Sequence, residues 1–124
     1  MAQGPVLAGT DGLVRGVEFP IEYGATVVVG RSRSCDLSLQ RLDSWESLKP
    51  EEQNQEKDFR AVSRKHVRIS YYNANSIEIE DLSSNGTFVD GKRVKRIVLT
   101  DLRERSYELI LGTREKFRLE WRSE

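Results

Sequence analysis

Hydrophobic and polar residues alternate over short stretches along most of the chain. Within residues 66–72, Val67, Ile69 and Tyr71 occupy every second position, and polar or amphipathic side chains lie between them. The same two-residue period recurs over Ser76–Glu80 and Lys116–Trp121. This period is typical of strands in a sheet that has one buried and one solvent-exposed face.

Stretches rich in β-branched and aromatic residues, bounded by Gly, Asn or Asp, predict about ten strands. The predicted strands are Val6–Ala8, Leu13–Phe19, Thr26–Gly30, Asp36–Leu39, His66–Tyr72, Ser76–Glu80, Gly86–Val89, Arg93–Val98, Ser106–Leu111 and Lys116–Trp121. Because no long helical pattern accompanies these strands, the chain predicts an all-β fold, an antiparallel β-sandwich.

One polar segment interrupts the alternation. Gln40–Arg60 carries six acidic and four basic residues. We interpret it as a long surface loop. A short helix is the alternative, because Asp43 and Glu46 have capping-box spacing and Trp45 and Leu48 would share one helical face.

Length and composition narrow the class of protein. The 124 residues fit a single domain, 1–124, and 20 Lys plus Arg balance 20 Asp plus Glu, without the basic excess of a dedicated nucleic-acid binder. Cys35 is the only cysteine and His66 the only histidine, which excludes a disulfide framework and the usual Cys/His zinc sites. We therefore expect no metal and no cofactor.

The apolar runs argue against a membrane protein. They reach at most four residues, far below the ~20 that a spanning helix needs. The start of the chain, Met1–Pro5, has neither the basic nor the apolar region of a signal peptide. We expect a cytoplasmic, intracellular protein without direct membrane insertion.

Charge is uneven in spite of the zero total. Residues 1–62 sum to −3 (seven basic, ten acidic) and residues 63–124 to +3 (thirteen basic, ten acidic). The basic places are Arg31 with Arg33, Arg64 with Lys65, and Lys92, Arg93, Lys95 and Arg96. They are either ordinary solvated turns or parts of one site. The last group alone does not predict nucleic-acid binding, since acids balance it and no aromatic stacking platform accompanies it.

Arg31 follows Gly30 at the end of a run of three valines, which places it at the mouth of a turn. There its guanidinium can offer two parallel N–H donors to a phosphate or carboxylate, and we expect the side chain to be largely solvated without ligand. The segment lacks the second glycine and the Lys-Ser/Thr of a P-loop.

Ser63 and Arg64 precede His66 at the start of the strongest predicted strand. A serine hydroxyl and a neighbouring basic side chain can donate to one anion, which is the chemistry of a phosphate clamp. An enzyme with Ser63 as nucleophile and His66 as base is not indicated, because no orienting acid or nucleophile-elbow glycine is present. A hydrogen-bonded structural role suits His66 better.

Asn85 and Gly86 form the dipeptide that most strongly signals a tight turn between strands. The other interpretation is an exposed Asn amide that both donates to and accepts from an extended peptide backbone.

In this order, Gly30-Arg31, Ser63-x-x-His66 and Asn85-Gly86-Thr87-Phe88 resemble the motifs of the forkhead-associated (FHA) domain family. The resemblance covers about residues 6–121. It implies a β-sandwich of about eleven strands and a non-enzymatic module whose loops at one end bind phosphothreonine peptides.

The resemblance also implies roles for single residues. Arg31 and Ser63 match the main phosphate contacts, and Arg64 matches a further one. Ser84 lines the same pocket, and Asn85 matches the residue that hydrogen-bonds the peptide backbone.

Gly30, His66 and Gly86 match positions that keep these loops in shape. The partner implied is a phosphothreonine-containing protein, either a Ser/Thr kinase or its substrate, and not a nucleic acid.

The chain departs from the family pattern between Leu39 and Ser63, where twenty-three residues replace the usual handful. Residues 40–60 are thus predicted to be an insert before the Ser63 loop. The insert supports an alternative function, a phosphate-independent interaction scaffold that uses Trp45, Leu48 and Phe59.

Overall fold

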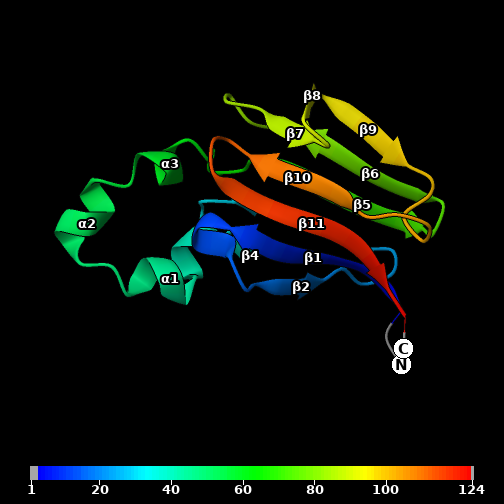
Figure 1. Ribbon diagram of the computed structural model, residues 1–124, viewed down its shortest axis with the longest axis horizontal. Coiled ribbons are helices and arrows are strands. Elements are labelled where there is room, and N and C mark those ends of the chain that lie inside the picture. Colours follow the sequence, from blue (N-terminus) through cyan, green and yellow to red (C-terminus); the bar gives the residue numbers. More distant parts are fainter. Residues whose placement is uncertain (1–2, 124) are drawn as a thin grey trace.

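Two sheets form the body of the protein in the computed structural model, which describes residues 3–123 (Figure 1). The six-stranded sheet has the order β2 (Glu18–Pro20), β1 (Gly4–Asp11), β11 (Glu115–Arg122), β10 (Tyr107–Leu111), β7 (Thr87–Val89) and β8 (Lys92–Val94). The five-stranded sheet has the order β4 (Leu37–Ser38), β3 (Thr26–Gly30), β5 (Val67–Asn73), β6 (Ser76–Asp81) and β9 (Arg96–Leu99).

The side chains buried between the sheets are those that the alternation predicted. Val67, Ile69 and Tyr71 of β5 are buried, and so are Phe117 and Leu119 of β11. Each fully buried side chain of this size contributes about 1.5–3 kcal/mol. The predicted β-sandwich is confirmed; β3 and β4 form a parallel pair, and the other strand pairs of residues 3–123 are antiparallel.

The predicted strand Leu13–Phe19 is wrong. Its first residues belong to a 3₁₀ turn, η1 (Gly12–Val14), and only β2 remains extended. The buried carboxylate of Glu115 accepts the Val14 N–H at 3.2 Å, and Val17 N–H donates to Val14 O at 2.9 Å. These bonds close a turn. The backbone N–H groups of Val14 and Val17 are therefore not available for pairing with a neighbouring strand.

The predicted strand Arg93–Val98 is also wrong as a single element. It is divided into β8 and β9, which belong to different sheets. The chain crosses between the sheets at Lys95, whose carbonyl accepts the Asp81 N–H at 2.8 Å.

The polar segment 40–60 is not a loop without regular structure, as we had interpreted it. It contains four short helices: η2 (Leu39–Arg41), α1 (Asp43–Glu46), α2 (Pro50–Asn54) and α3 (Lys57–Arg60). That the segment is an insert relative to the resembled family stays a prediction.

The predicted capping box at Asp43 and Glu46 does not form. Asp43 already lies inside α1, whose N-cap is Leu42 without a side-chain cap bond. The corresponding contact occurs at α2, where the Glu52 carboxylate accepts the Lys49 N–H at 2.8 Å.

Aromatic packing joins α1 and α3 of the segment. The rings of Trp45 in α1 and Phe59 in α3 stack with centroids 3.6 Å apart and planes at 10°. Phe59 and Val62 are buried in the core. Phe59 thus belongs to the core, and Leu42 and Trp45 pack against it.

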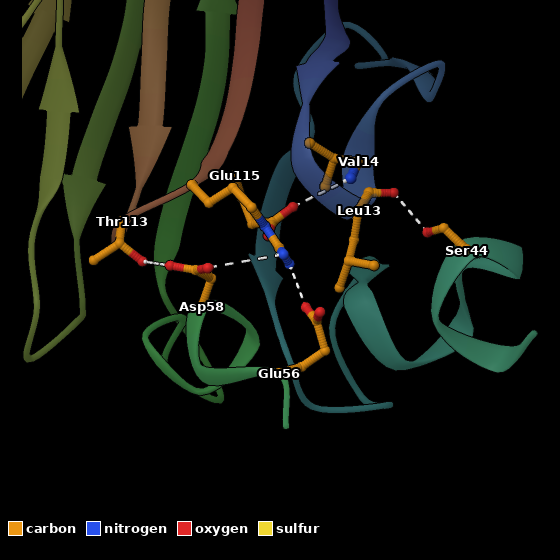
Figure 2. A network of polar contacts seen from close by, with 8 residues as sticks. Leu13, Val14, Ser44, Glu56, Asp58, Thr113 and Glu115 are labelled. Carbon is orange, nitrogen blue, oxygen red and sulfur yellow. Dashed lines mark hydrogen bonds and ion pairs between the residues drawn. The ribbon is translucent and has the colours of Figure 1, made fainter. Parts of the chain in front are cut away.

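A polar network fixes the same helices to the sandwich (Figure 2). Arg114 pairs with Glu56 at 2.7 Å and with the buried Glu115 at 2.9 Å. In Figure 2, Thr113 points to Asp58, with an Oγ1–Oδ1 distance of 2.6 Å.

The start of the segment is held separately. The Ser44 hydroxyl of α1 donates to Leu13 O at 2.6 Å (Figure 2). Both ends of the helical segment thus bind the sandwich at one end, and Figure 1 shows the N and C labels at the other.

Within residues 3–123, no helix is long and apolar enough to cross a bilayer. No group of three or more His, Cys, Asp or Glu side chains in that range is arranged to hold a metal ion.

Arg114→Gln is expected to lower the free energy of unfolding by about 1–3 kcal/mol at pH 7, because the buried Glu115 carboxylate loses its cation. Burial already raises the pKa of Glu115. The loss should therefore shrink as the pH falls and Glu115 takes up a proton, which urea unfolding at several pH values would measure.

The matched control is Arg118→Gln in β11, the strand that follows Arg114. Arg118 is exposed, and its ion pair with Glu120 is long, at 3.5 Å. Its loss should therefore change the free energy of unfolding by about 0.5 kcal/mol or less. Equal losses in the two variants, or a loss in Arg114→Gln that does not depend on pH, would contradict the role given to the network.

Candidate functional site

Four loops meet at the end of the sandwich that carries the helical segment. They are the β3–β4 loop (31–36), the end of the β4–β5 connection (61–66), the β6–β7 loop (82–86) and the β10–β11 turn (112–114). They bring together the residues that the motifs singled out.

Close backbone approach joins the first two loops. Arg31 N–H donates to Ser63 O at 3.1 Å, and Ser32 N–H donates to Arg64 O at 3.0 Å. A Cβ atom on Gly30 would lie 2.2 Å from Arg64 O. Only glycine lets the strand end come this near, because no side chain fits in that space.

His66 joins the second loop to the third. Its Nδ1 accepts the Ser63 N–H at 3.0 Å, so the proton of the neutral ring is on Nε2, which donates to Gly86 O at 2.8 Å. The side chain is completely buried, and burial lowers the pKa of His66. Both ring nitrogens are thus occupied by backbone groups, and neither serves the Ser63 hydroxyl as a general base.

Side chains of the third loop reach the second. The Ser63 hydroxyl oxygen accepts the Ser84 N–H at 3.2 Å, and Asn85 Nδ2 donates to Ala61 O at 3.0 Å. Ser84 and Asn85 are exposed. The first bond holds the Ser63 hydroxyl against the backbone of the third loop, and the second holds the Asn85 amide against the second loop.

Asp81 organises the third loop, a role that our sequence reasoning did not assign. Its buried Oδ1 accepts the Ser83 N–H at 3.1 Å, the Ser83 hydroxyl at 2.6 Å and the Thr87 hydroxyl at 2.8 Å. Burial alone would raise the pKa of Asp81, but these hydrogen bonds lower it. The Asp-x-Ser spacing of an Asx turn is the sequence signal that would have indicated it.

Arg31 is not largely solvated, contrary to our expectation. The side chain is half-buried, its Nε donates to Val62 O, and its guanidinium carbon lies 5.7 Å from the centroid of the Phe59 ring. The two terminal nitrogens have no acceptor within residues 3–123. They carry four of the five guanidinium protons.

Three basic residues beside Arg31 and Ser63 lack acidic partners within residues 3–123. Arg33, Arg64 and Lys65 are exposed, and no carboxylate in the described part of the chain lies within 4.0 Å of their charged groups.

The basic group at 92–96 does not form one patch. Lys95 and Arg96 pair with Asp81 and Glu78 of the five-stranded sheet, at 4.0 Å for the first pair. Arg93, in the other sheet, places its guanidinium against Gly86, where an added Cβ would lie 2.9 Å from Nε. Arg93 thus lies against the third loop itself, and Lys95 reaches only Asp81 at the start of that loop.

His66→Ala is expected to lower the free energy of unfolding by about 2–4 kcal/mol, because it leaves a cavity and two unpaired backbone groups. His66→Gln, whose amide can still donate to Gly86 O, should lose less. Chemical denaturation of both variants tests this expectation, which equal losses would contradict.

The stability of the wild type should also depend on pH through His66. The unfolded chain takes up a proton near pH 6.5, whereas the folded chain does so only at lower pH. The contribution of neutral His66 to the free energy of unfolding is complete above pH 6.5. It decreases below that pH, by at most about 1.4 kcal/mol per pH unit. NMR titration of the single imidazole is the direct measurement; a folded-state pKa at or above 6.5 would contradict the expectation.

Comparison with known proteins agrees with this geometry. A search of curated proteins found no significant match. Among solved structures, the FHA domain of CT664 from Chlamydia trachomatis superposes with a TM-score of 0.70 at 26% identity, covering 98% of this chain and 100% of that one.

Two further structures share the fold. An FHA domain studied for its phosphothreonine-dependent interactions gives a TM-score of 0.67 at 21% identity, with 99% and 100% of the chains covered. The FhaA FHA domain in complex with the intracellular domain of Rv3910 gives 0.62 at 23% identity, with 93% and 99% covered.

The family comparison concerns the sequence itself. The model of the FHA domain family matches residues 27–107, which is most of the chain and includes each of the three motifs. The protein belongs to the FHA domain family, a family of phosphothreonine-dependent interaction modules.

Proposed function

We propose that this chain binds phosphothreonine peptides at the loops around His66. In this proposal Arg31 and Ser63 make the main phosphate contacts, and Arg64 and Ser84 add further donors. The observation that carries it is the state of Arg31: one nitrogen is held by Val62 O and two have no acceptor in the described chain. A forked guanidinium held in this way suits a dianionic phosphate.

The distribution of charge supports an anionic ligand. Most ion pairs of the described chain lie on the sheet faces, as with Arg68–Glu80 and Arg122–Glu18. The cations next to Ser63 lack such partners, so their field is not cancelled locally and attracts a phosphate.

Asn85 is proposed to hold the peptide backbone beside the phosphothreonine. One amide proton is used by Ala61 O, and the side-chain oxygen accepts no hydrogen bond within residues 3–123. That oxygen can accept a peptide N–H, and the second amide proton can be donated. This pair of functions suits an extended peptide.

The partner is proposed to be a phosphothreonine-containing protein, a Ser/Thr kinase or a kinase substrate, bound without catalysis. Solved FHA domains support this class, since one was studied for phosphothreonine-dependent interactions. Cys35, a buried free thiol, fits a reducing compartment such as the cytoplasm.

The scaffold alternative through residues 40–60 has less support. Phe59 is buried, and Trp45 is half-buried and stacks on it, so neither ring is fully exposed to a partner. The large hydrophobic side chains most exposed in the described chain are Tyr23, Tyr72 and Val98, none of which belongs to the segment.

A degenerate phosphothreonine peptide library and its unphosphorylated form test the proposal by titration. Two or three charged hydrogen bonds of ~1.5–3 kcal/mol each imply a preference for the phosphorylated form of about 10²- to 10⁴-fold. Arg31→Ala should remove most of it and Arg64→Ala a smaller part.

The control for these variants is Arg103→Ala. Arg103 is exposed and lacks an acidic partner in residues 3–123, but it lies near Tyr71, at the end of the sandwich away from the loops. Its loss should leave binding unchanged. Equal affinity of wild type for the two forms of the library would refute the phosphothreonine proposal and favour the scaffold.

A further inference from the structure

Three side chains from distant parts of the chain form a stack beside the proposed phosphate site. Trp45 of α1 lies on Phe59 of α3 at 3.6 Å between ring centroids, and the Arg31 guanidinium carbon lies 5.7 Å from the Phe59 centroid. A cation within about 6 Å of a ring centroid is attracted by the ring quadrupole. Phe59 is thus in contact range of Arg31 and is itself buried, with 6% of its surface exposed.

The backbone just after α3 holds Arg31 as well. Val62, three residues after Phe59, is completely buried and provides the carbonyl that accepts the Arg31 Nε–H. The guanidinium is therefore held by a carbonyl and a ring that belong to the same helical turn.

The position of this turn is itself determined by polar contacts. Asp58 accepts the Thr113 hydroxyl at 2.6 Å, and Glu56 accepts from Arg114 at 2.7 Å (Figure 2). Trp45, which stacks on the Phe59 ring, is held through its neighbour Ser44, which donates to Leu13 O at 2.6 Å. Phe59 is thereby fixed relative to η1 and to the β10–β11 turn of the sandwich.

A free arginine side chain has many rotamers, and fixing one of them costs affinity when a ligand binds. The contacts of Arg31 restrict it before the ligand arrives and leave its terminal nitrogens available.

We propose that Phe59, supported by Trp45, is a positioning residue that holds Arg31 ready for the phosphate, so that the helical segment is a working part of the binding site. This inference rests on the proposed function. It gives the segment a role that requires no direct contact between the segment and the peptide.

The first test is Phe59→Leu, which keeps an apolar side chain in the core and removes the ring. We expect affinity for the best phosphothreonine peptide of the library to fall about three- to tenfold. Tyr107→Leu is the matched control, since it removes the other cation–ring pair, Arg105 over Tyr107 at 3.9 Å, and should leave affinity unchanged.

Arg31→Lys separates positioning from a general structural effect. Lysine keeps the charge but has no Nε–H for Val62 O and no planar fork to lie over Phe59. If Phe59 acts through Arg31, adding Phe59→Leu to Arg31→Lys should lower affinity less than twofold. The same loss in both backgrounds would show a structural effect and overturn the proposal.

Trp45 provides a spectroscopic measurement. The chain has two tryptophans, so Trp121→Phe leaves Trp45 as the only one. Saturating phosphopeptide without tryptophan should change the Trp45 emission, because Trp45 stacks on the ring that lies 5.7 Å from the Arg31 guanidinium, the group that the phosphate would bind. Unchanged emission at saturation would count against the proposal.

Trp45→Leu covers the case in which Phe59→Leu does not fold. It removes the support of the ring and leaves both Phe59 and Arg31, so we expect a weaker loss of about two- to fivefold. Unchanged affinity in a folded Trp45→Leu would overturn the proposal.

The outcomes distinguish the two proposals. A wild type that binds both forms of the library equally would refute phosphothreonine binding itself. A wild type that prefers the phosphorylated form, with Phe59→Leu equal to it, would refute only the positioning role.

Discussion

One buried imidazole connects the elements on which the binding end depends. His66 accepts from the Ser63 N–H and donates to Gly86 O, so the two loops are held at a spacing set by a rigid ring. The arrangement requires a neutral ring, and burial favours that form. Gly30 makes it possible, because the close approach of β3 to residues 63–64 leaves no room for a side chain.

The arginines of the sheet faces and Arg31 at the loops differ in the charge of their partners. On the sheet faces, arginines such as Arg68 and Arg122 are neutralised by nearby carboxylates. At the loops, Arg31 is held instead by a carbonyl and an aromatic ring. Neither of these neutral partners cancels its charge, and both orient it. A zero net charge is therefore compatible with an anion-binding end.

The sequence predicted those features whose physical cause is local. The buried faces of β5, β6 and β11 followed from a two-residue period, which needs no knowledge of distant contacts. The three motifs also indicated the end where Arg31, Ser63 and Asn85 meet.

The loop interpretation of the segment was wrong, and the alternative of a short helix anticipated only α1 (Asp43–Glu46), because the causes of the other helices are not local. Helices of four or five residues are too short for a clear period and are unstable on their own. They form here because Arg114, 58 residues away along the chain, binds Glu56, and because Phe59 finds Trp45 and the core. Arg31 is half-buried because it contacts that segment. Its burial therefore could not be predicted from the residues next to it in the sequence.

The pairing of the first strand with the last has a mechanical consequence. β1 and β11 are antiparallel, and Gly4 lies opposite Arg122 at the end of the molecule away from the loops. A pulling force applied at these two positions loads the ladder bonds one after another, as in a zipper, instead of all together in shear. The β1–β11 pair would separate at low force, beginning at Gly4 and Arg122. The loops around His66 lie at the opposite end of this pair and would be loaded last.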